Sequence, residues 1–196
     1  MIYIYIIAGI FIVVAAYWLA SNIEDPVERA GRRGEEVAED IISNVHRDDD
    51  ILLTNVELSY EGKRTEADII VINQNGVFII EVKNYVGELV GDIDDSEWKK
   101  YKTTPGGDVY VKTVRNPIKQ VKRQIYIVSS ILKARRIKVW VEGYVMLMEN
   151  NSPVDDKMIL RNIHEIDSAI HGSTEQIISK KEIDKIVSIL QPNANA

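Results

Sequence analysis

The sequence predicts an α/β fold preceded by one transmembrane helix. Three observations support this fold class: an uncharged apolar run at residues 2–20, two β-branched strands within residues 68–83, and an amphipathic helical pattern that begins at Asn116. Strands mixed with helices of this kind are typical of a sheet that packs against helices. The 196-residue chain is therefore divided into a transmembrane anchor at residues 1–22 and one domain of ordinary size at residues 23–196.

The amino-terminal run has about the length that a helix needs to cross roughly 30 Å of hydrocarbon. It carries no charge and has aromatic side chains near both ends, as expected at two membrane interfaces. Arg29, Arg32 and Arg33 follow it and no basic side chain precedes it, so the positive-inside rule predicts a single-pass protein of the cell membrane with a cytoplasmic carboxy-terminal domain. The alternative is a buried helix of a soluble core.

The remaining elements follow from turn and capping signals. Asp25-Pro26 begins a helix, Asn116-Pro117 begins another, and Ser179 with Glu182 forms a capping box that begins the last one. Strands are expected at residues 51–58, 87–92, around Trp98, and at 109–112, 137–148 and 157–160, with a loop at 103–108.

Asn75-Gly76 lies between two runs rich in Ile and Val and predicts a β-hairpin with a two-residue type I′ turn. With that turn, Asp68 lies opposite Lys83. Because side chains alternate along a strand, Asp68, Glu81 and Lys83 then share one face. Any loop with an even number of residues preserves this arrangement, whereas a three-residue loop would move Asp68 to the other face.

Two carboxylates beside a lysine suit a hard cation such as Mg²⁺, which binds oxygen ligands together with substrate phosphate and water. The lysine could orient or activate the attacking water, or offset charge on the phosphate. A salt bridge at a partly exposed strand end is the simpler alternative. The nearly continuous apolar strands around these charges favour the site, because buried charges are costly unless they are paired or bound to metal.

The order and spacing of these residues resemble the PD-(D/E)XK nuclease superfamily, and in particular its NERD (nuclease-related domain) branch. The matching segments span residues 31 to about 124: Gly31-x-x-Gly34-Glu35, Glu66-Ala67-Asp68, Gly76-Val77-Phe78, Glu81-Val82-Lys83-Asn84-Tyr85, Gly87, Gly91-Asp92, Trp98 and Asn116-Pro117-x-x-Gln120. Ala67 stands where the family usually has a proline. The resemblance implies a restriction-endonuclease-like core, in which helices flank a mixed central sheet.

The resemblance also implies roles for individual residues. Asp68 and Glu81 would hold Mg²⁺, or Mn²⁺, together with the backbone carbonyl of Val82, and Lys83 would be the catalytic lysine. The candidate catalytic set is Glu35, Asp68, Glu81, Lys83 and Gln120. Glu35 also lies beside the apolar stripe of its predicted helix. A solvated acid near a helix start is the alternative for Glu35, and a simple boundary residue is the alternative for Gln120.

Charge is unevenly distributed along the chain. The net charge is −6, yet residues 99–138 contain twelve Lys or Arg and one acid, Asp108. This stretch suits contact with phosphates of DNA or RNA, with Lys119, Lys122 and Arg123 as candidate contacts. Attraction to anionic lipids is the alternative. The chain has no cysteine, so disulfides and thiolate metal sites are excluded.

These observations predict a membrane-anchored, metal-dependent nuclease that hydrolyses phosphodiester bonds. A non-catalytic nucleic-acid or membrane-surface binding module with the same fold is the competing hypothesis, and a small nucleotide is a third possible substrate. None of the three histidines has a recognised metal-ligand spacing. No Walker-type loop, dinucleotide fingerprint or Ser/His/Asp arrangement is present.

Overall fold

Two sheets organise the part of the chain that the computed structural model describes, namely residues 37–38, 40, 42–172 and 177–191. These residues fall within one compact unit, residues 34–196. The elements are β1 (Ile51–Tyr60), β2 (Lys63–Asn73), β3 (Gly76–Lys83), β4 (Glu88–Val90), β5 (Glu97–Thr103), β6 (Val109–Arg115), α3 (Pro117–Ala134), β7 (Val141–Leu147), β8 (Ile159–Leu160), α4 (Ile163–His171) and α5 (Lys180–Leu190).

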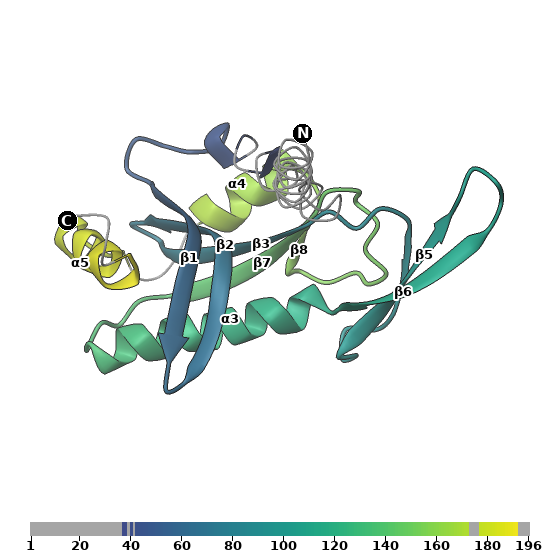
Figure 1. Ribbon diagram of the computed structural model, residues 1–196. Coiled ribbons are helices and arrows are strands. Elements are labelled where there is room, and N and C mark those ends of the chain that lie inside the picture. The colour runs from purple at the N-terminus through teal and green to yellow at the C-terminus, as the bar shows by residue number, and fades with distance from the viewer. Residues whose placement is uncertain (1–36, 39, 41, 173–176, 192–196) are drawn as a thin grey trace, which may run out of the picture. The chain divides into compact units, whose positions relative to one another are not determined.

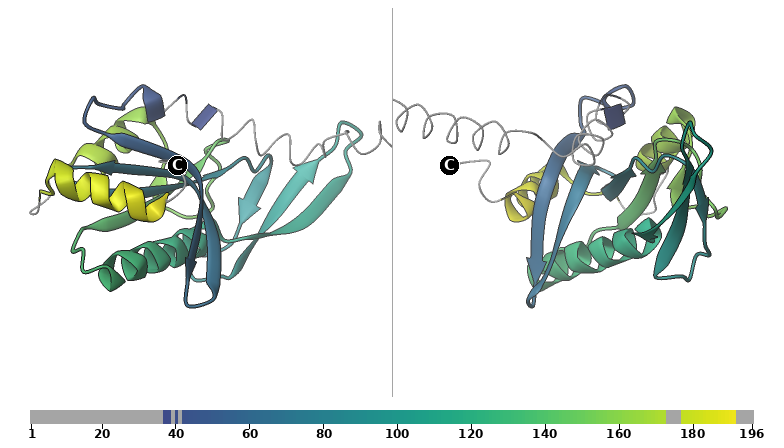
Figure 2. Two further views of the ribbon diagram at one scale, coloured as in Figure 1. Left: turned by 60° about the vertical axis from the view of Figure 1, so that its left-hand side comes forward. Right: turned by 45° about the vertical axis from the view of Figure 1, so that its right-hand side comes forward.

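The main sheet has the strand order β1-β2-β3-β7-β8 and is mixed (Figure 1). The pairs β1–β2 and β2–β3 are antiparallel, whereas β3–β7 and β7–β8 are parallel. Helices α3 and α5 pack on one face of this sheet and share one apolar cluster, whereas α4 packs on the other face over a second cluster (Figure 2). This mixed α/β fold is compatible with a nuclease-like core.

The smaller sheet, β4-β5-β6, is antiparallel and projects beyond the main sheet as a two-stranded arm formed by β5 and β6 (Figures 1 and 2). Its base is fixed by Trp98, which is fully buried and packs with Leu89 and with α3 residues such as Ile118. The expected strands at 87–92, around Trp98 and at 109–112 are confirmed as β4, β5 and β6. The expected loop at 103–108 lies at the end of this arm.

Helix α3 begins where the Asn-Pro signal predicts, since Asn116 caps it by accepting from the Ile118 amide. The predicted strand at 137–148 is too long, because β7 begins only at Val141. Arg136 has a φ of +59°, and the Ile137 amide donates to the Leu132 carbonyl at the end of α3. The backbone of Ile137 is thus committed to closing the helix and does not join the sheet. The capping box at Ser179 is confirmed, whereas α4 was not predicted.

The hairpin register differs from the prediction by two residues. Asn73 pairs with Gly76, so the turn residues are Gln74 and Asn75 rather than Asn75 and Gly76. Neither turn residue has the positive φ that a type I′ turn requires. Instead, the Asn73 side chain accepts from the Asn75 amide at 2.9 Å and so stabilises the turn, as an Asx turn does. The predicted pairing of Asp68 with Lys83 is therefore wrong, but the loop still has an even number of residues.

Gly76 is needed for close packing of strands rather than for the turn. Its φ is +149°, and a Cβ at this position would lie 2.7 Å from the Trp140 carbonyl oxygen. That carbonyl accepts from the Val77 amide at 2.9 Å, which joins the start of β3 to the segment that leads into β7.

We expect Gly76→Ala to lower the free energy of unfolding by about 3 kcal/mol, because backbone strain and a backbone collision add. Gly62→Ala is the matched control, since Gly62 also has a positive φ but no atom within 4 Å of the new Cβ. The control should cost about 1 kcal/mol. Urea unfolding of both variants measures the difference, and equal losses would contradict the packing argument.

Three sequence predictions lie outside the described residues: the transmembrane helix at residues 2–20, the start of a helix at Asp25-Pro26 and the helix-borne acid Glu35. Within the described segments, no helix is both long and apolar enough to cross a membrane.

Candidate active site

Asp68, Glu81 and Lys83 lie on the face of the main sheet that α3 covers. The neighbouring residues Ile70 and Ile79 pack in the same cluster as α3, and strand alternation carries this face to the three charged residues. Extending the β2–β3 register by one pair sets Asp68 opposite Glu81. The even loop therefore preserves the predicted common face, although the cross-strand partner differs.

Glu81 lies at the centre of the arrangement and is fully buried. Lys83 and Gln120 both donate to its Oε1, and Gln124 donates to its Oε2 at 2.5 Å. Helix α3 thus supplies two amide groups to a carboxylate on β3. A buried carboxylate with three donors is held in one orientation, as a metal-binding or catalytic group must be.

Asp68 is the more accessible carboxylate, with 14% of its side chain exposed. Its Oδ2 accepts from the Val82 amide at 2.7 Å and lies 4.0 Å from the Lys83 ammonium. The interaction thus involves the Val82 amide, whereas the sequence predicts a role for the Val82 carbonyl. That role stays a prediction.

Burial dominates the protonation of both carboxylates. It raises the pKa of Asp68 and of Glu81, and the nearby Lys83 ammonium offsets only part of this effect. Burial by itself would lower the pKa of Lys83, but Glu81 and Asp68 together outweigh it and raise that pKa. When both buried carboxylates are ionised, they carry one negative charge more than the Lys83 ammonium offsets, and a bound cation would neutralise it.

Gln124 is a site residue that the sequence analysis did not single out. It is fully buried, and its amide also donates to the Glu66 carbonyl at 2.7 Å, so it connects β2 and β3 to α3. Its Oε1 is buried without a hydrogen-bond partner. The sequence feature that could have identified Gln124 is its position four residues after Gln120, because this spacing places both glutamines on one helix face.

We expect Gln124→Leu to reduce any metal-dependent activity by about 10- to 100-fold, because groups that orient metal ligands have effects of this size. The metal concentration that gives half-maximal rate should rise as well, whereas a purely structural role would not change it. Gln74→Leu, at the exposed hairpin turn, is the control. An unchanged metal requirement in Gln124→Leu would contradict a positioning role.

The site opens into a pocket of about 900 Å³. Asp68, Glu81, Lys83 and Gln120 line it, and cations surround it from β2, β6 and α3: Arg64, Arg115, Lys119 and Arg123. Of the three predicted nucleic-acid contacts, Lys119 and Arg123 therefore lie at the pocket. Lys122 is exposed on α3 and is not part of the lining.

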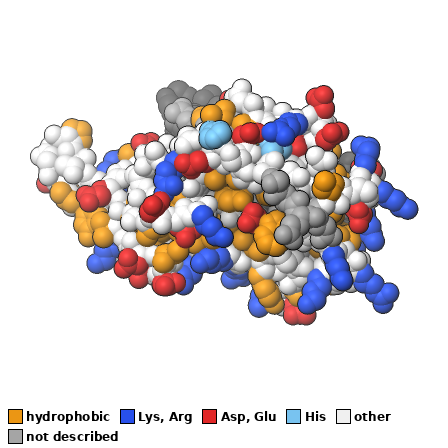
Figure 3. All heavy atoms as spheres, turned by 180° about the vertical axis from the view of Figure 1, so that it is seen from behind, with side chains coloured by type: hydrophobic (Ala, Val, Ile, Leu, Met, Phe, Trp, Pro, Cys, Tyr) orange, Lys and Arg blue, Asp and Glu red, His pale blue; other side chains and the backbone are white. Residues whose placement is uncertain are grey.

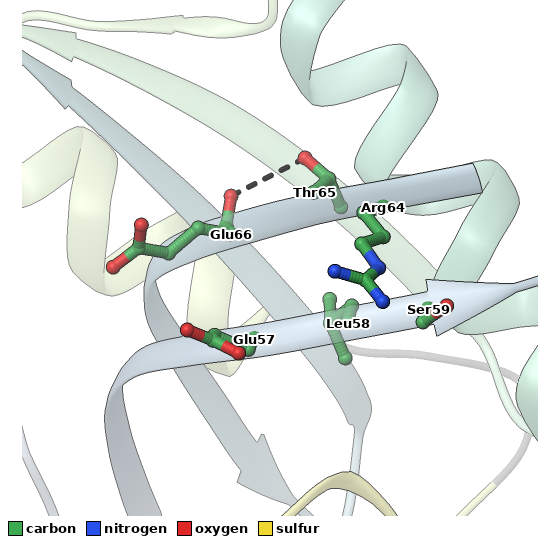
Figure 4. A pocket seen from close by; sticks show the side chains of 6 residues that line it. All are labelled: Glu57, Leu58, Ser59, Arg64, Thr65 and Glu66. Atoms are coloured by element: carbon green, nitrogen blue, oxygen red, sulfur yellow. Dashed lines mark hydrogen bonds between the residues drawn. The ribbon is translucent and has the colours of Figure 1, made fainter. Parts of the chain in front are cut away.

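A second hollow of about 510 Å³ lies on the β1–β2 ribbon and shares Arg64, Thr65 and Glu66 with the main pocket (Figure 4). Glu57 and Glu66 are cross-strand partners in it. Their side chains extend in the same direction, and Arg64 reaches from β2 toward β1 (Figure 4). Both glutamates are exposed, and among the described residues no third acid or histidine joins them. We therefore assign no metal site or reaction to this hollow.

The donor set of the main pocket fits a hard divalent cation. Two carboxylates on neighbouring strands match the one or two that Mg²⁺ usually takes from a protein, and phosphate and water supply the rest. No group of three or more His, Cys, Asp or Glu converges anywhere in the described segments. Two further acids, Glu66 and Glu97, line the pocket, and Glu35 lies outside the described residues.

A mixed α/β fold with two carboxylates and a lysine on one sheet face is compatible with a nuclease-like domain. Residues 30–148 match the family model of the nuclease-related domain, NERD, which covers more than half of the chain. The chain therefore belongs to the NERD family, and this membership indicates a nuclease-like function.

One curated relative is an uncharacterized protein of Bacillus anthracis that is 35% identical over 69 residues. The match covers 35% of this chain and 32% of the relative, so it spans about a third of the relative's length. No solved structure matches the chain significantly.

Proposed function

We propose that the protein is a Mg²⁺- or Mn²⁺-dependent nuclease that hydrolyses phosphodiester bonds of DNA or RNA. The observation that carries this proposal is the convergence of Asp68, Glu81 and Lys83 in one cation-rimmed pocket, with Glu81 fully buried. Membership of the NERD family supports the same class of reaction.

Each residue has a distinct role in this proposal. Asp68 and Glu81 hold the cation, with the Val82 carbonyl as a further ligand, and Gln120 keeps the Glu81 carboxylate in place. When bound, the cation would polarise a phosphoryl oxygen and lower the pKa of a bound water. Lys83 orients the attacking water or offsets negative charge that develops on the phosphate. Glu35 is the proposed third acid of the site.

A non-catalytic binding module is the second candidate, and one observation favours it. Both Glu81 oxygens already accept hydrogen bonds from Lys83, Gln120 or Gln124. Three donors therefore occupy Glu81, two on Oε1 and one on Oε2. Since a carboxylate has roughly four acceptor positions, only one, on Oε2, is left for a cation, as expected of a carboxylate whose main role is structural.

Cleavage assays with the full-length chain distinguish the two candidates. Fluorescently labelled single- and double-stranded DNA and RNA are incubated with Mg²⁺, with Mn²⁺ or with EDTA. The nuclease proposal expects metal-dependent shortening of at least one substrate, together with metal binding in calorimetry. Binding of nucleic acid without cleavage under any condition would favour the binding module.

We further propose that residues 2–20 anchor the protein in the cell membrane, with the domain in the cytoplasm. The uncharged run and the arginines at 29, 32 and 33 support this orientation. Fractionation of cells should recover the protein with membranes, from which detergent but not high salt or alkali releases it. Release by salt alone would contradict an integral anchor.

A further inference from the structure

The β5–β6 arm carries a cationic face that the site does not use. In the arm register, Lys100 pairs with Lys112 and Lys102 pairs with Tyr110, so all four side chains share one face. We define these four residues as the cationic face. Lys102, Lys112 and Tyr110 are exposed, and 63% of Tyr110 is accessible.

Like charges directly opposite each other destabilise a pair of strands. Lys100 and Lys112 have this arrangement, and Lys102 is two residues from Lys100 on the same strand. Burial, followed by the charges of Lys112 and Lys102, lowers the pKa of Lys100. No salt bridge to any of these three lysines is present among the described residues. An anion on this face would relieve the repulsion.

The cationic face is connected to the active site through Tyr85. The Lys100 ammonium lies 5.5 Å from the centre of the Tyr85 ring. Burial raises the pKa of Tyr85, and the charges of Lys83, Glu81, Arg115 and Asp68 all act on it, so this ring lies within the electrostatic range of the site. At the arm's base, Glu97 and Arg115 line the main pocket from the opposite face of the arm, because they have the other parity in the register. The path from the pocket to the cationic face therefore passes Tyr85, and a polyanion in the pocket could continue along it.

From this arrangement we propose that the cationic face binds single-stranded nucleic acid and holds it beside the Asp68–Glu81 pocket. The lysines contact successive phosphates and the exposed Tyr110 ring stacks on a base. Stacking on an aromatic side chain requires an accessible base face, which a single strand offers and an intact duplex does not. The role of the bound strand as a substrate rests on the proposed nuclease function, but binding to the cationic face can be measured without cleavage.

Charge argues against a second copy of the chain as the occupant. The outer edge of β6 is unpaired, and Val109 and Val111 are more than half exposed beside it. Pairing two such edges, however, would bring the lysines of one arm against those of the other. The end of the arm stands clear of the rest of the surface, with apolar side chains on it, so an extended ligand can reach it (Figure 3).

The test measures binding without catalysis. The full-length chain is titrated, in EDTA, against fluorescein-labelled 20-nucleotide single strands of DNA and RNA, the matching duplexes, and vesicles that contain phosphatidylserine. The arm variant combines Lys100→Gln, Lys102→Gln and Lys112→Gln. The control variant removes three cations at the far end of α3 with Lys133→Gln, Arg135→Gln and Lys138→Gln, so both lose the same charge.

We expect the arm variant to bind single strands at least tenfold more weakly at low salt. The slope of log affinity against log salt should fall in magnitude by about 2, since each phosphate contact on a single strand contributes about 0.7. Tyr110→Ala should weaken binding at least about fivefold, whereas Tyr110→Trp should retain it, because stacking depends on the ring. The control variant should bind like wild type, and thermal melting confirms that each variant is folded.

Equal losses in the arm and control variants would overturn the proposal, as would a preference for vesicles over oligonucleotides that depends on the arm. Equal dependence of duplex and single-strand binding on Tyr110 would also overturn it. Binding through the arm without cleavage in Mg²⁺ or Mn²⁺ would support the arm and contradict the nuclease. If wild type cleaves nucleic acid, and the arm variant binds and cleaves it as wild type does, the nuclease proposal is supported and the arm proposal is contradicted.

Discussion

Asp68→Asn is expected to reduce metal-dependent cleavage by at least about a thousandfold. A bound cation contributes several kcal/mol to stabilisation of a phosphoryl-transfer transition state, and each 1.36 kcal/mol corresponds to a factor of ten in rate. Asn keeps the size of the side chain and can still accept from the Val82 amide, so the fold should survive. Single-turnover cleavage assays measure the rate, and calorimetry with Mn²⁺ measures the accompanying loss of metal affinity.

Lys83→Met should separate catalysis from metal binding. Its ammonium donates to Glu81 and lies near Asp68, so removing it frees carboxylate oxygens for the cation while removing the group proposed to act on water or phosphate. We therefore expect cleavage to fall by about 10²- to 10³-fold. Metal affinity should be unchanged or higher.

The controls for these two variants are Asp94→Asn, in the loop before β5, and Lys185→Met, on α5. Both positions lie outside the pocket lining, so both variants should cleave at the wild-type rate. If Asp68→Asn retains metal affinity, or if Lys83→Met loses it, the assigned roles are wrong. If wild type itself neither binds metal nor cleaves, the binding-module hypothesis replaces the nuclease.

The common face of Asp68, Glu81 and Lys83 could be predicted because it depends only on strand alternation and on an even loop. The register could not, because two competing turns satisfy the same rule. In the structure, Gln74 and Asn75 form the turn, which the Asn73 side chain stabilises. Gly76 lies in β3 instead, where it packs closely against the Trp140 carbonyl. The glycine of the Asn-Gly pair is therefore explained by a contact with a segment far away in the sequence, and not by the turn.

Packing against α3 explains why Gln120 was found and Gln124 was missed. Both lie near the apolar stripe, and sequence periodicity gives their angle on the helix but not the depth at which the helix meets the sheet. The tight approach of α3 to β7 at Gly143, where a Cβ would lie 2.4 Å from a Val121 methyl group, brings the helix close to the strands. At that depth Gln124 is fully buried and reaches Glu81.

The second large expected effect concerns stability: the Asp68 carboxylate that is proposed to bind the cation lowers the free energy of unfolding when it is ionised. In the absence of metal, burial raises the folded-state pKa of Asp68, so its charged form destabilises the native state. Below the ordinary carboxyl pKa both states hold the proton and the cost is absent. As pH rises toward the raised pKa, the unfolded state releases its proton first and native stability falls. Asp68→Asn should avoid this loss.

We therefore expect Asp68→Asn to unfold at higher urea concentrations than wild type at neutral pH in EDTA, by about 1.4 kcal/mol for each unit of raised pKa, and to match it in acid. Asp50→Asn should show the opposite sign. Although burial opposes ionisation of Asp50, hydrogen bonds from the Arg47 amide, His171 and Asn73 hold its pKa below the ordinary value. Its charge stabilises the fold at neutral pH, and this contribution is lost as pH falls through the lowered pKa. If Asp68→Asn lowered the stability at neutral pH, as Asp50→Asn is expected to do, the Asp68 carboxylate would be a structural salt-bridge partner rather than a group whose charge the fold holds at a cost.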